Sequence, residues 1–140
     1  MAGGPSVYAA NYLLDKALKG VDFTPPSTWY VALFVTSSET YLRSNTIASA
    51  SEVANAGAYA RKALLPTQIA ASTTGQSQIT ADIIFDTASA PWGTIYQAAI
   101  TDSPTRGAGN IWWFGPLSAS ATIQIGDVLK IPAYSFNINM

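Results

Sequence analysis

Short runs of β-forming residues alternate with clusters of turn-forming residues from Tyr59 to the end of the chain. The intervening stretches are rich in Gly, Pro, Ser, Asn and Asp, and the runs recur at about the spacing of strands in an all-β sandwich or barrel. The runs cover residues 59–65, 78–85, 94–101, 110–114, 121–125, 128–131 and 135–138. This pattern restricts most of the chain to a mainly β fold.

One further strand is expected at residues 27–36, where Pro25 and Pro26 favour extended backbone at the start. Its side chains are apolar on both faces, with Trp29, Val31, Leu33 and Val35 on one and Tyr30, Ala32 and Phe34 on the other. A strand that is apolar on both faces belongs near the centre of a layered structure. The loop-like stretch 37–58 is expected to hold a short strand around Tyr41.

Residues 6–19 carry the clearest helical pattern. Apolar residues recur there at three- and four-residue spacing, namely Val7, Ala10, Leu14, Ala17 and Leu18. Ser6 suits an N-cap and Gly20 a left-handed C-cap. We expect the apolar face of this helix to lie against the body of the domain. The sequence thus predicts a β-sandwich or jelly-roll-like fold of about eight strands with one N-terminal α-helix, in a single domain over residues 1–140.

The pair Gly126-Asp127, between Ile125 and Val128, has the form of a two-residue hairpin turn, since Gly supplies positive φ at the first central position. We therefore expect the two flanking strands to pair with each other.

The chain has no Cys and no His, which excludes thiol catalysis, Cys/His zinc sites and a Ser-His-Asp triad. Asp82 and Asp86 come closest to a carboxylate pair, but four residues along a strand place them roughly 13 Å apart, beyond the spacing of glycosidase carboxylates. An oxygen-only calcium site from Asp82, Asp86, Asp102 or Asp127 stays an alternative, although no spacing resembles an EF-hand loop. We expect no catalytic residue, no metal site and no cofactor.

The composition indicates a surface that other subunits cover. Only 11% of the residues are charged while 49% are hydrophobic, against about 25% charged in a typical soluble domain. Such an exterior suits a subunit covered by copies of itself or by a larger assembly; a monomer with a hydroxyl-coated surface is the alternative. The net charge is -1 with no cluster of either sign, so neither nucleic acid nor an anionic membrane is an expected partner.

Five residues are candidates for an interface with other subunits. Trp112 and Trp113 are adjacent, so on a strand one faces the core and the other faces outward, to anchor a neighbouring subunit or to stack on a sugar ring. Arg61 is expected to pair with Glu39 or Glu52 at a subunit boundary, with an ordinary surface ion pair as the alternative. The candidate interface residues are Tyr41, Tyr59, Arg61, Trp92 and Trp113.

Several short motifs occur in a fixed order along nearly the whole chain. They are LLDKALKG from residue 13, PSTWYVALF from 26, EVANAGAYARK from 52, ITADIIFDTASAPWGTIYQAAITD from 79, NIWWFGPL from 110 and IQIGDVLKIPAYSFNINM from 123. In their order and spacing they resemble a family of small tailed-phage virion proteins, commonly labelled tail fibre proteins. The resemblance implies a non-enzymatic phage structural protein built as a β-sandwich or jelly roll. Ala54, Asn55 and Ala56 stand where that family is richer in Gly, and the loop 37–51 is more elaborate.

The resemblance leaves the location in the virion open, because similar small β-proteins serve as capsid cement, as tail or baseplate parts and as fibre modules. The chain is short, has few charges and lacks repeats, which favours a capsid decoration or cement protein that stabilises the shell by burying surface between capsomers. We expect a homotrimer on the outer surface of the capsid, bound to the major capsid protein or to tail proteins. The helix, a mobile segment 1–5 and the loop 37–55 are the expected contacts.

Three alternatives to the cement function stay open. The first is a tail, baseplate or tail-fibre component. The second is a carbohydrate-binding adhesin module with exposed Trp92 and Trp113 as sugar platforms. The third is an enzyme that depends on Asp82.

Overall fold

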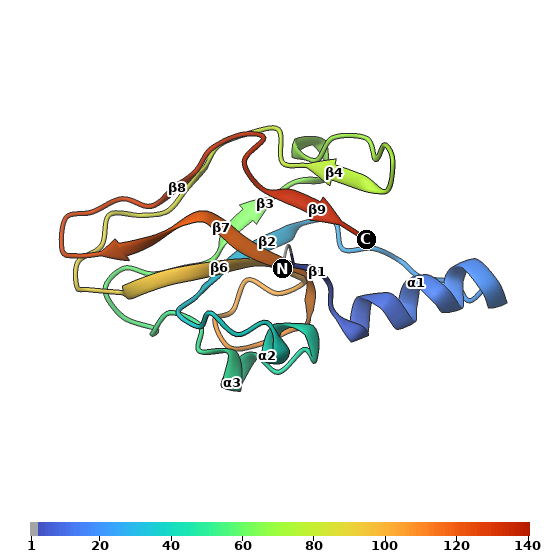
Figure 1. The fold of residues 1–140 in the computed structure, drawn as a ribbon, viewed down its shortest axis with the longest axis horizontal. Helices are drawn as coiled ribbons and strands as arrows, with labels where there is room; N and C mark the ends of the chain where they lie inside the picture. Colours follow the sequence, from blue (N-terminus) through green and yellow to red (C-terminus); the bar gives the residue numbers. More distant parts are fainter. Residues whose placement is uncertain (1–2) are drawn as a thin grey trace.

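The centre of the molecule is a five-stranded antiparallel sheet with the strand order β1-β7-β6-β2-β3 (Figure 1). The structure, a computed structural model, describes residues 3–140. The strands of this sheet are β1 (Gly4–Pro5), β2 (Trp29–Phe34), β3 (Lys62–Leu64), β6 (Gly93–Thr101) and β7 (Ile111–Ile123).

Two narrow ribbons cover one face of the sheet, and two short helices cover the other (Figure 1). The ribbons are β4 (Gln76–Gln78) with β9 (Asn137–Asn139) and β5 (Ile83–Ile84) with β8 (Lys130–Ile131). The helices are α2 (Thr40–Arg43) and α3 (Ile47–Ala50), and a 3-10 turn, η1 (Pro66–Gln68), follows β3. The mainly β, sandwich-like fold is thus confirmed, with nine strands in residues 3–140. The single-domain boundary at 1–140 stays a prediction.

Strand β2 is buried on both faces, as its sequence pattern predicts. Val31 and Leu33 belong to the apolar cluster between the sheet and the ribbons. Ala32 and Phe34 belong to the cluster between the sheet and α2 and α3. All four are at most 1% exposed. Because both faces of the sheet are covered, a central strand can be apolar at every position.

Two of the predicted strand boundaries are wrong. Residues 110–114 and 121–125 were expected as separate strands, but β7 runs through Gly115 and Pro116 without a turn. Beyond Phe114 one side of β7 is open, since β1 pairs only with Trp113 and Phe114, and an open edge is where a strand accommodates Pro. Conversely, the run 78–85 divides between β4 and β5, because the chain passes there from one ribbon to the other.

The segments around Tyr41 and Gly126 also differ from expectation. The residues around Tyr41 form helix α2 and not the predicted strand. Leu42 of this helix packs against the sheet. The turn near Gly126 spans residues 124–127, with Asp127 N donating to Gln124 O at 3.1 Å and Gly126 at the second central position with φ +89°. It is not a hairpin, because β8 pairs with β5 instead of β7.

Helix α1 (Val7–Lys19) has the ends that the sequence predicts, but its apolar face points the other way. Ser6 Oγ accepts from Ala9 N at 3.1 Å, and Gly20 ends the helix in the left-handed region with φ +68°. Among the helix residues only Ala9 is buried, and α1 projects from one end of the molecule (Figure 1). The expectation that the apolar face lies against the domain body is therefore wrong.

The segment before α1 is anchored to the sheet. Gly4 and Pro5 form β1, which pairs with Phe114 and Trp113, so these two residues are not the mobile arm that the sequence indicated. Met1 and Ala2, from the same expected arm, lie outside the described residues. None of the helices in residues 3–140 is long and apolar enough to cross a membrane.

Candidate functional site

The base of α1 is held by an aromatic cluster around Trp112 of β7. The Trp112 ring lies 5.3 Å from Tyr8 in edge-to-face geometry, 5.0 Å from Phe23 in stacked geometry, and 5.3 Å from Trp29 in edge-to-face geometry. Tyr12, one turn along α1 from Tyr8, is 5.7 Å from the same ring. Trp112 itself is only 3% exposed. Since aromatic pairs at these distances are attractive beyond the area they bury, the cluster fixes the direction in which α1 leaves the sheet.

Asp102, which directly follows β6, is hydrogen-bonded to Trp112 of this cluster. Its Oδ1 accepts from Asn110 N at 2.7 Å, and its Oδ2 accepts from Asn110 Nδ2 at 3.0 Å and from Trp112 Nε1 at 3.1 Å. Burial by itself raises the pKa of the Asp102 carboxyl, but the hydrogen bonds from Asn110 and Trp112 outweigh it, and the pKa lies below its ordinary value of 3.8. The carboxylate therefore stays charged in the folded protein at neutral pH.

Asp102→Asn is expected to destabilise the protein most at neutral pH and less in acid. The variant replaces an acceptor by an NH₂ group that faces other donors, which costs about 1–3 kcal/mol. Since the folded-state pKa is depressed, the contribution of Asp102 to stability is present above pH 3.8 and is lost as the pH falls below that value. Urea unfolding of both proteins at pH 7 and at pH 3 measures this. A difference that is equal at the two pH values would contradict the assignment, and Asp22→Asn, at an exposed carboxylate, controls for the loss of one negative charge.

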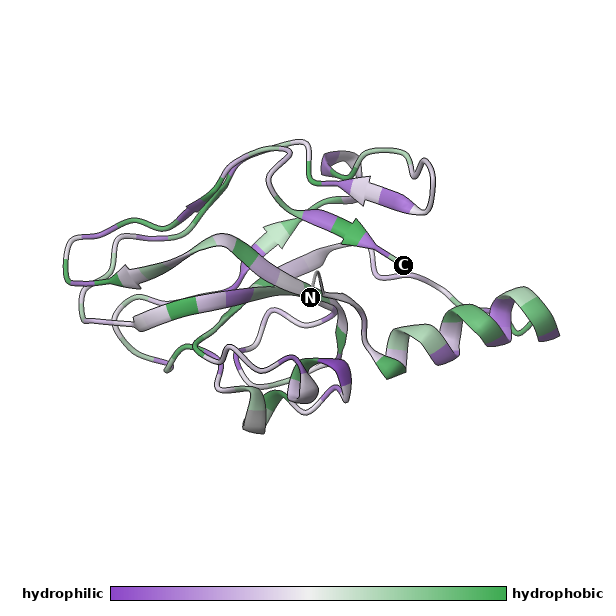
Figure 2. Cartoon of the chain, viewed as in Figure 1, coloured by the Kyte–Doolittle hydropathy of each residue, from purple (hydrophilic) through white to green (hydrophobic). Residues whose placement is uncertain are grey.

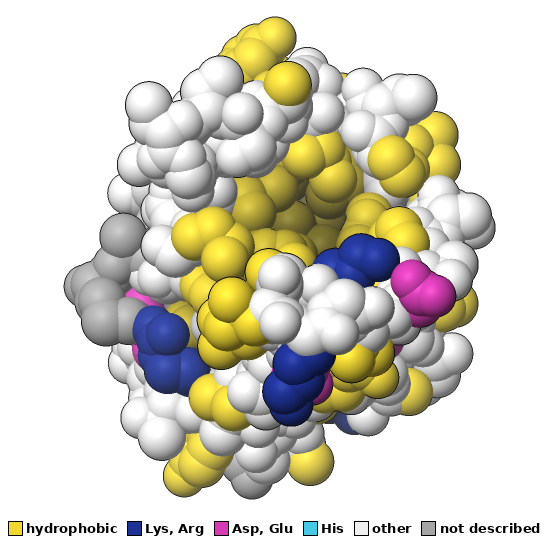
Figure 3. Space-filling model, turned by 90° about the vertical axis from the view of Figure 1, so that its right-hand side faces the viewer, with side chains coloured by type: hydrophobic (Ala, Val, Ile, Leu, Met, Phe, Trp, Pro, Cys, Tyr) yellow, Lys and Arg dark blue, Asp and Glu magenta, His cyan; other side chains and the backbone are white. Residues whose placement is uncertain are grey.

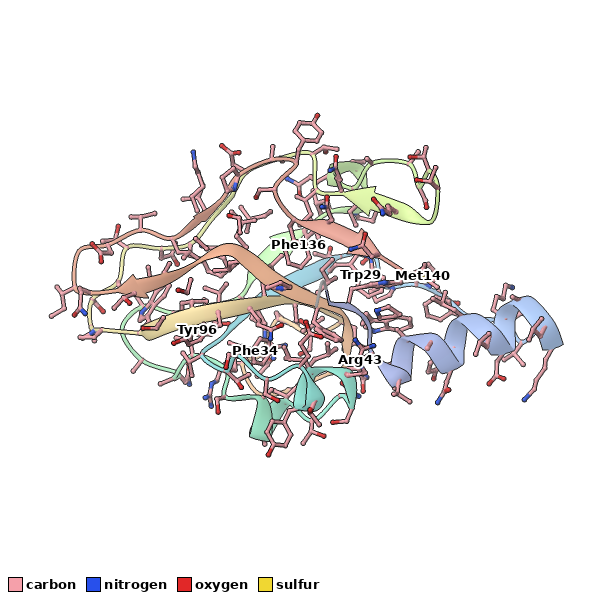
Figure 4. The ribbon with its side chains drawn as sticks, viewed as in Figure 1. Trp29, Phe34, Arg43, Tyr96, Phe136 and Met140 are labelled. Carbon is pink, nitrogen blue, oxygen red and sulfur yellow. The ribbon has the colours of Figure 1, made fainter. Side chains whose placement is uncertain are left out.

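An apolar hollow lies beside this cluster, on the end from which α1 projects (Figure 3). Its volume is about 270 Å³. Trp29 connects the two features, because its ring packs on Trp112 and also lines the hollow. The large apolar residues around the hollow are Trp29, Ile69, Ile100, Trp113, Ile138 and Met140, and small residues from the segment 70–77 complete its rim. Trp29 and Met140 lie near each other at the base of α1 (Figure 4). We call the surface formed by α1 and this hollow the α1 end.

The other notable cluster of polar side chains is buried and structural. Arg61 donates through Nε to Glu52 Oε1 and through Nη2 to Glu52 Oε2, both at 2.8 Å, and both side chains are at most 1% exposed. Arg61 Nη1 also donates to Ser103 O at 2.8 Å and to Ala108 O at 2.9 Å. Gly107 N donates to Glu52 Oε2 at 2.8 Å. The pair therefore attaches the loop 103–109 to the segment that precedes β3.

Tyr59 belongs to the same network. Its hydroxyl donates to Glu52 Oε1 at 2.8 Å and accepts from Leu33 N at 3.0 Å. Burial raises the pKa of the Tyr59 phenol far above its ordinary value, and the negative charge of Glu52 raises it further. The phenol is therefore neutral at neutral pH, and it acts as a hydrogen-bonding group of the core.

Three of the five candidate interface residues lie inside the chain. Tyr59 is 5%, Arg61 6% and Trp92 6% exposed. Arg61 pairs with Glu52, one of its two expected partners, but the pair lies in the interior of this chain and not on its surface. Trp92 packs against Tyr59 and donates through Nε1 to Gly57 O at 2.8 Å. In this fold these three residues are core residues.

The other two candidates reach the surface. Tyr41 on α2 is exposed, and Trp113 is half-buried and lines the hollow of the α1 end. The sequence did not predict the hollow, because the residues that line it come from five separate parts of the chain. The exposed apolar stripe of α1 was visible as helical periodicity, although its direction was not.

Comparison with known proteins identifies the family. No curated protein sequence matches the chain. Residues 4–139 match the family model described as podophage GP4 fiber I protein gp80, a range that begins in β1, ends in β9 and includes the aromatic cluster and every residue around the hollow except Met140. The resemblance to phage tail fibre proteins is thereby confirmed, and the chain belongs to the podophage GP4 fiber I protein gp80 family.

Proposed function

We propose that this protein is a structural component of a phage tail fibre, which works by burying surface against other virion proteins. The family match over residues 4–139 is the observation that carries the proposal. The apolar α1 end supports it, since an exposed apolar region of this kind on a soluble protein marks a contact surface.

The two acidic residues that come closest to a carboxylate pair have structural partners, which supports a non-enzymatic function. Asp82 Oδ1 accepts from Ala133 N at 2.8 Å, and its Oδ2 lies 3.8 Å from Lys130 Nζ. Asp86 pairs with Lys62 at 2.7 Å. These contacts tie neighbouring strands and loops together. Among residues 3–140, no three acidic side chains gather closely enough to hold a metal ion.

The fibre is a better assignment than the capsid decoration favoured by the sequence alone. The family description names a fiber protein, whereas the small size and low charge that favour cement are equally expected of a small fibre subunit. The expected homotrimer stays a prediction, and so does the expected association with the major capsid protein or with tail proteins.

The carbohydrate-binding adhesin loses one of the two tryptophans proposed for it. Trp92 is buried and its indole N–H is already donated to Gly57 O, so it offers no open ring face to a sugar. A polar cavity of about 280 Å³ lies beneath α1 between Tyr12, Phe23 and Asp102. Both carboxylate oxygens of Asp102 accept from protein donors, and Asp22, the other carboxylate that lines the cavity, is exposed and lies 3.4 Å from Lys16 Nζ.

Locating the protein in whole virions tests the proposal. Gold-labelled antibodies against the recombinant chain are expected to mark the tail region of intact particles in electron micrographs. After the tails are sheared off, the protein is expected to leave with the tail fraction. Co-purification with DNA-filled heads would establish capsid decoration instead, and absence from both fractions would overturn a structural function in the virion.

A further inference from the structure

The polar cavity beneath α1 combines aromatic rings with carboxylates. It has a volume of about 280 Å³ and lies between the first turns of α1, the segment 22–26 and β7. Its aromatic and acidic lining residues are Tyr8, Tyr12, Phe23, Trp112, Asp22 and Asp102. No Lys or Arg of the 3–140 segment is among the residues that line it. Because small-molecule pockets span about 300–1,000 Å³, a cavity of this size suits a single side chain or head group. We call it the tyrosine cavity.

The rings of the tyrosine cavity hold one another in place. Tyr12 packs on Tyr8 at 4.9 Å and on Phe23 at 5.6 Å, both in tilted geometry, and Phe23 stacks on Trp112 at 5.0 Å. Tyr12 is 39% exposed, so part of its ring is accessible to a ligand. The face of an aromatic ring carries the negative part of its quadrupole and attracts cations. The packing therefore fixes a cation-attracting surface before any ligand binds.

Asp102 gives the cavity a negative charge that is not neutralised by any cation in residues 3–140. The three groups that donate to its carboxylate, two from Asn110 and one from Trp112, are neutral N–H groups. The ion pairs of the described residues do not include Asp102. Its carboxylate is charged at neutral pH, because these hydrogen bonds outweigh the effect of burial on its pKa.

The other charges near the cavity cancel each other. Lys16 Nζ lies 3.4 Å from Asp22 Oδ1, and both side chains are exposed. The hydrophilic bands of α1 begin beyond its base, so the part of the helix over the cavity carries no charge (Figure 2). Burial raises the pKa of the Tyr8 phenol, Tyr12 and the charge of Asp102 raise it further, and it reaches about 12. The Tyr8 phenol is therefore neutral, and the net charge at the cavity is that of Asp102.

We propose that the tyrosine cavity binds the basic side chain of a Lys or Arg from another virion protein. A cation gains both from the ring faces and from the Asp102 charge, whereas an anion is repelled and a neutral group gains neither. The aliphatic stem of a Lys or Arg can pack along the rings of Tyr12 and Phe23 while its head group approaches Asp102. The source of the side chain rests on the proposed function, in which this protein buries surface against other virion proteins.

Model compounds test the ligand chemistry without a partner protein. The full chain is titrated with N-acetyl-lysine methylamide and with N-acetyl-norleucine methylamide, which has a similar aliphatic stem and no charge. The indole N–H signal of Trp112, which donates to Asp102, and the amide signals of residues 22–24 report binding in two-dimensional NMR spectra. The lysine compound is expected to shift these signals with a millimolar dissociation constant, and the norleucine compound is expected to bind at least about tenfold more weakly.

Two variants and the ionic strength separate the contributions of the rings and of the charge. Tyr12→Leu is expected to weaken binding of the lysine compound about threefold, and Asp102→Asn at least about fivefold. Far-UV circular dichroism checks that each variant is folded at the temperature of the titration. Asp86→Asn, at an exposed carboxylate that pairs with Lys62, is the matched control and should bind like the wild type. Raising the NaCl concentration from about 0.01 M to about 1 M should weaken the lysine compound only.

Photo-cross-linking in phage particles tests the source of the side chain. Thr24 lines the cavity, and p-benzoylphenylalanine in its place labels whatever lies there on irradiation. The mass spectrum of the digest is expected to show residue 24 joined to a segment of another virion protein that contains Lys or Arg. The same replacement at Asp86 should not label that segment. Links from residue 24 only to this chain's own sequence would overturn the partner.

Three results would overturn the cation site itself: no shift with the lysine compound, equal binding of the lysine and norleucine compounds, or undiminished binding by Asp102→Asn. Tighter binding of choline than of the lysine compound would assign the cavity to a free quaternary ammonium ligand and overturn the basic side chain. The virion location is decided separately by the antibody experiment. Lysine binding by a protein that is absent from both virion fractions would keep the cation site and overturn only its virion partner.

Discussion

Arg61→Met is expected to lower the free energy of unfolding by about 3–5 kcal/mol, because the variant leaves a buried carboxylate without its cation. Glu52 and Arg61 are both almost fully buried and joined by two hydrogen bonds of 2.8 Å. In the variant, Glu52 keeps only the Tyr59 hydroxyl and Gly107 N as donors. The carbonyls of Ser103 and Ala108 lose their Arg61 donor as well. Urea unfolding at pH 7 measures the loss.

Two further variants show whether the buried pair is the cause. Lys62→Met, at the neighbouring position, removes a partly exposed ion pair with Asp86 and is expected to change the free energy of unfolding by less than about 1 kcal/mol. Adding Glu52→Gln to Arg61→Met removes the uncompensated charge and is expected to recover part of the loss. If the Arg61→Met variant proved as stable as the Lys62→Met variant, the Glu52–Arg61 pair could not be desolvated in the folded protein.

Trp112→Ala is expected to cost about 3–5 kcal/mol of stability, as is typical for truncating a buried aromatic residue, and to detach α1 from the sheet. The ring is the shared partner of Tyr8, Phe23 and Trp29. Without it, the base of the helix keeps buried Ala9 and two hydrogen bonds from Ser6, whose N donates to Trp112 O and whose Oγ donates to Ile111 O. Hydrogen exchange at residues 7–19 is expected to accelerate by more than the global loss of stability explains, since the helix then opens locally.

Trp92→Ala is the control for local detachment of the helix. Trp92 is as buried as Trp112 but packs against Tyr59 and Phe85 in the core between the sheet and the ribbons. Its truncation should lower global stability by a similar amount, with exchange in α1 following the global change only. Equal exchange in α1 for the two variants, at matched global stability, would show that Trp112 does not anchor the helix.

The sequence sufficed where short-range interactions decide the structure. The limits of α1 follow from a cap at Ser6, a left-handed Gly20 and periodicity between them, all of which act within four residues along the chain. The position of β2 follows from apolar residues on both faces, which only a strand between two covering layers can bury. The family, too, was recognisable from the order of short motifs.

Strand and turn limits failed where pairing partners decide them. Pro116 looks like a strand end in the sequence, yet it lies within β7 because that part of the strand has an open edge. Gly126-Asp127 looks like a hairpin, yet the chain beyond it joins β5, about forty residues earlier in the sequence. Tyr41 lies in a β-favouring run of residues, but the packing of Leu42 against the sheet selects a helix.

The candidate site needed the three-dimensional structure for a similar reason. Arg61 has the same local sequence whether it lies on the surface or in the core, and its burial depends on carbonyls at Ser103 and Ala108, more than forty residues away. The apolar face of α1 follows from the periodicity of the helix's own residues. The outward direction of that face is set by contacts with Trp112, about a hundred residues further along the chain. Local hydrogen bonds and periodicity thus specify which elements form and which faces are apolar. Which of those faces stays exposed depends on many weak contacts between residues that are distant in the sequence. A short stretch of sequence therefore cannot specify it.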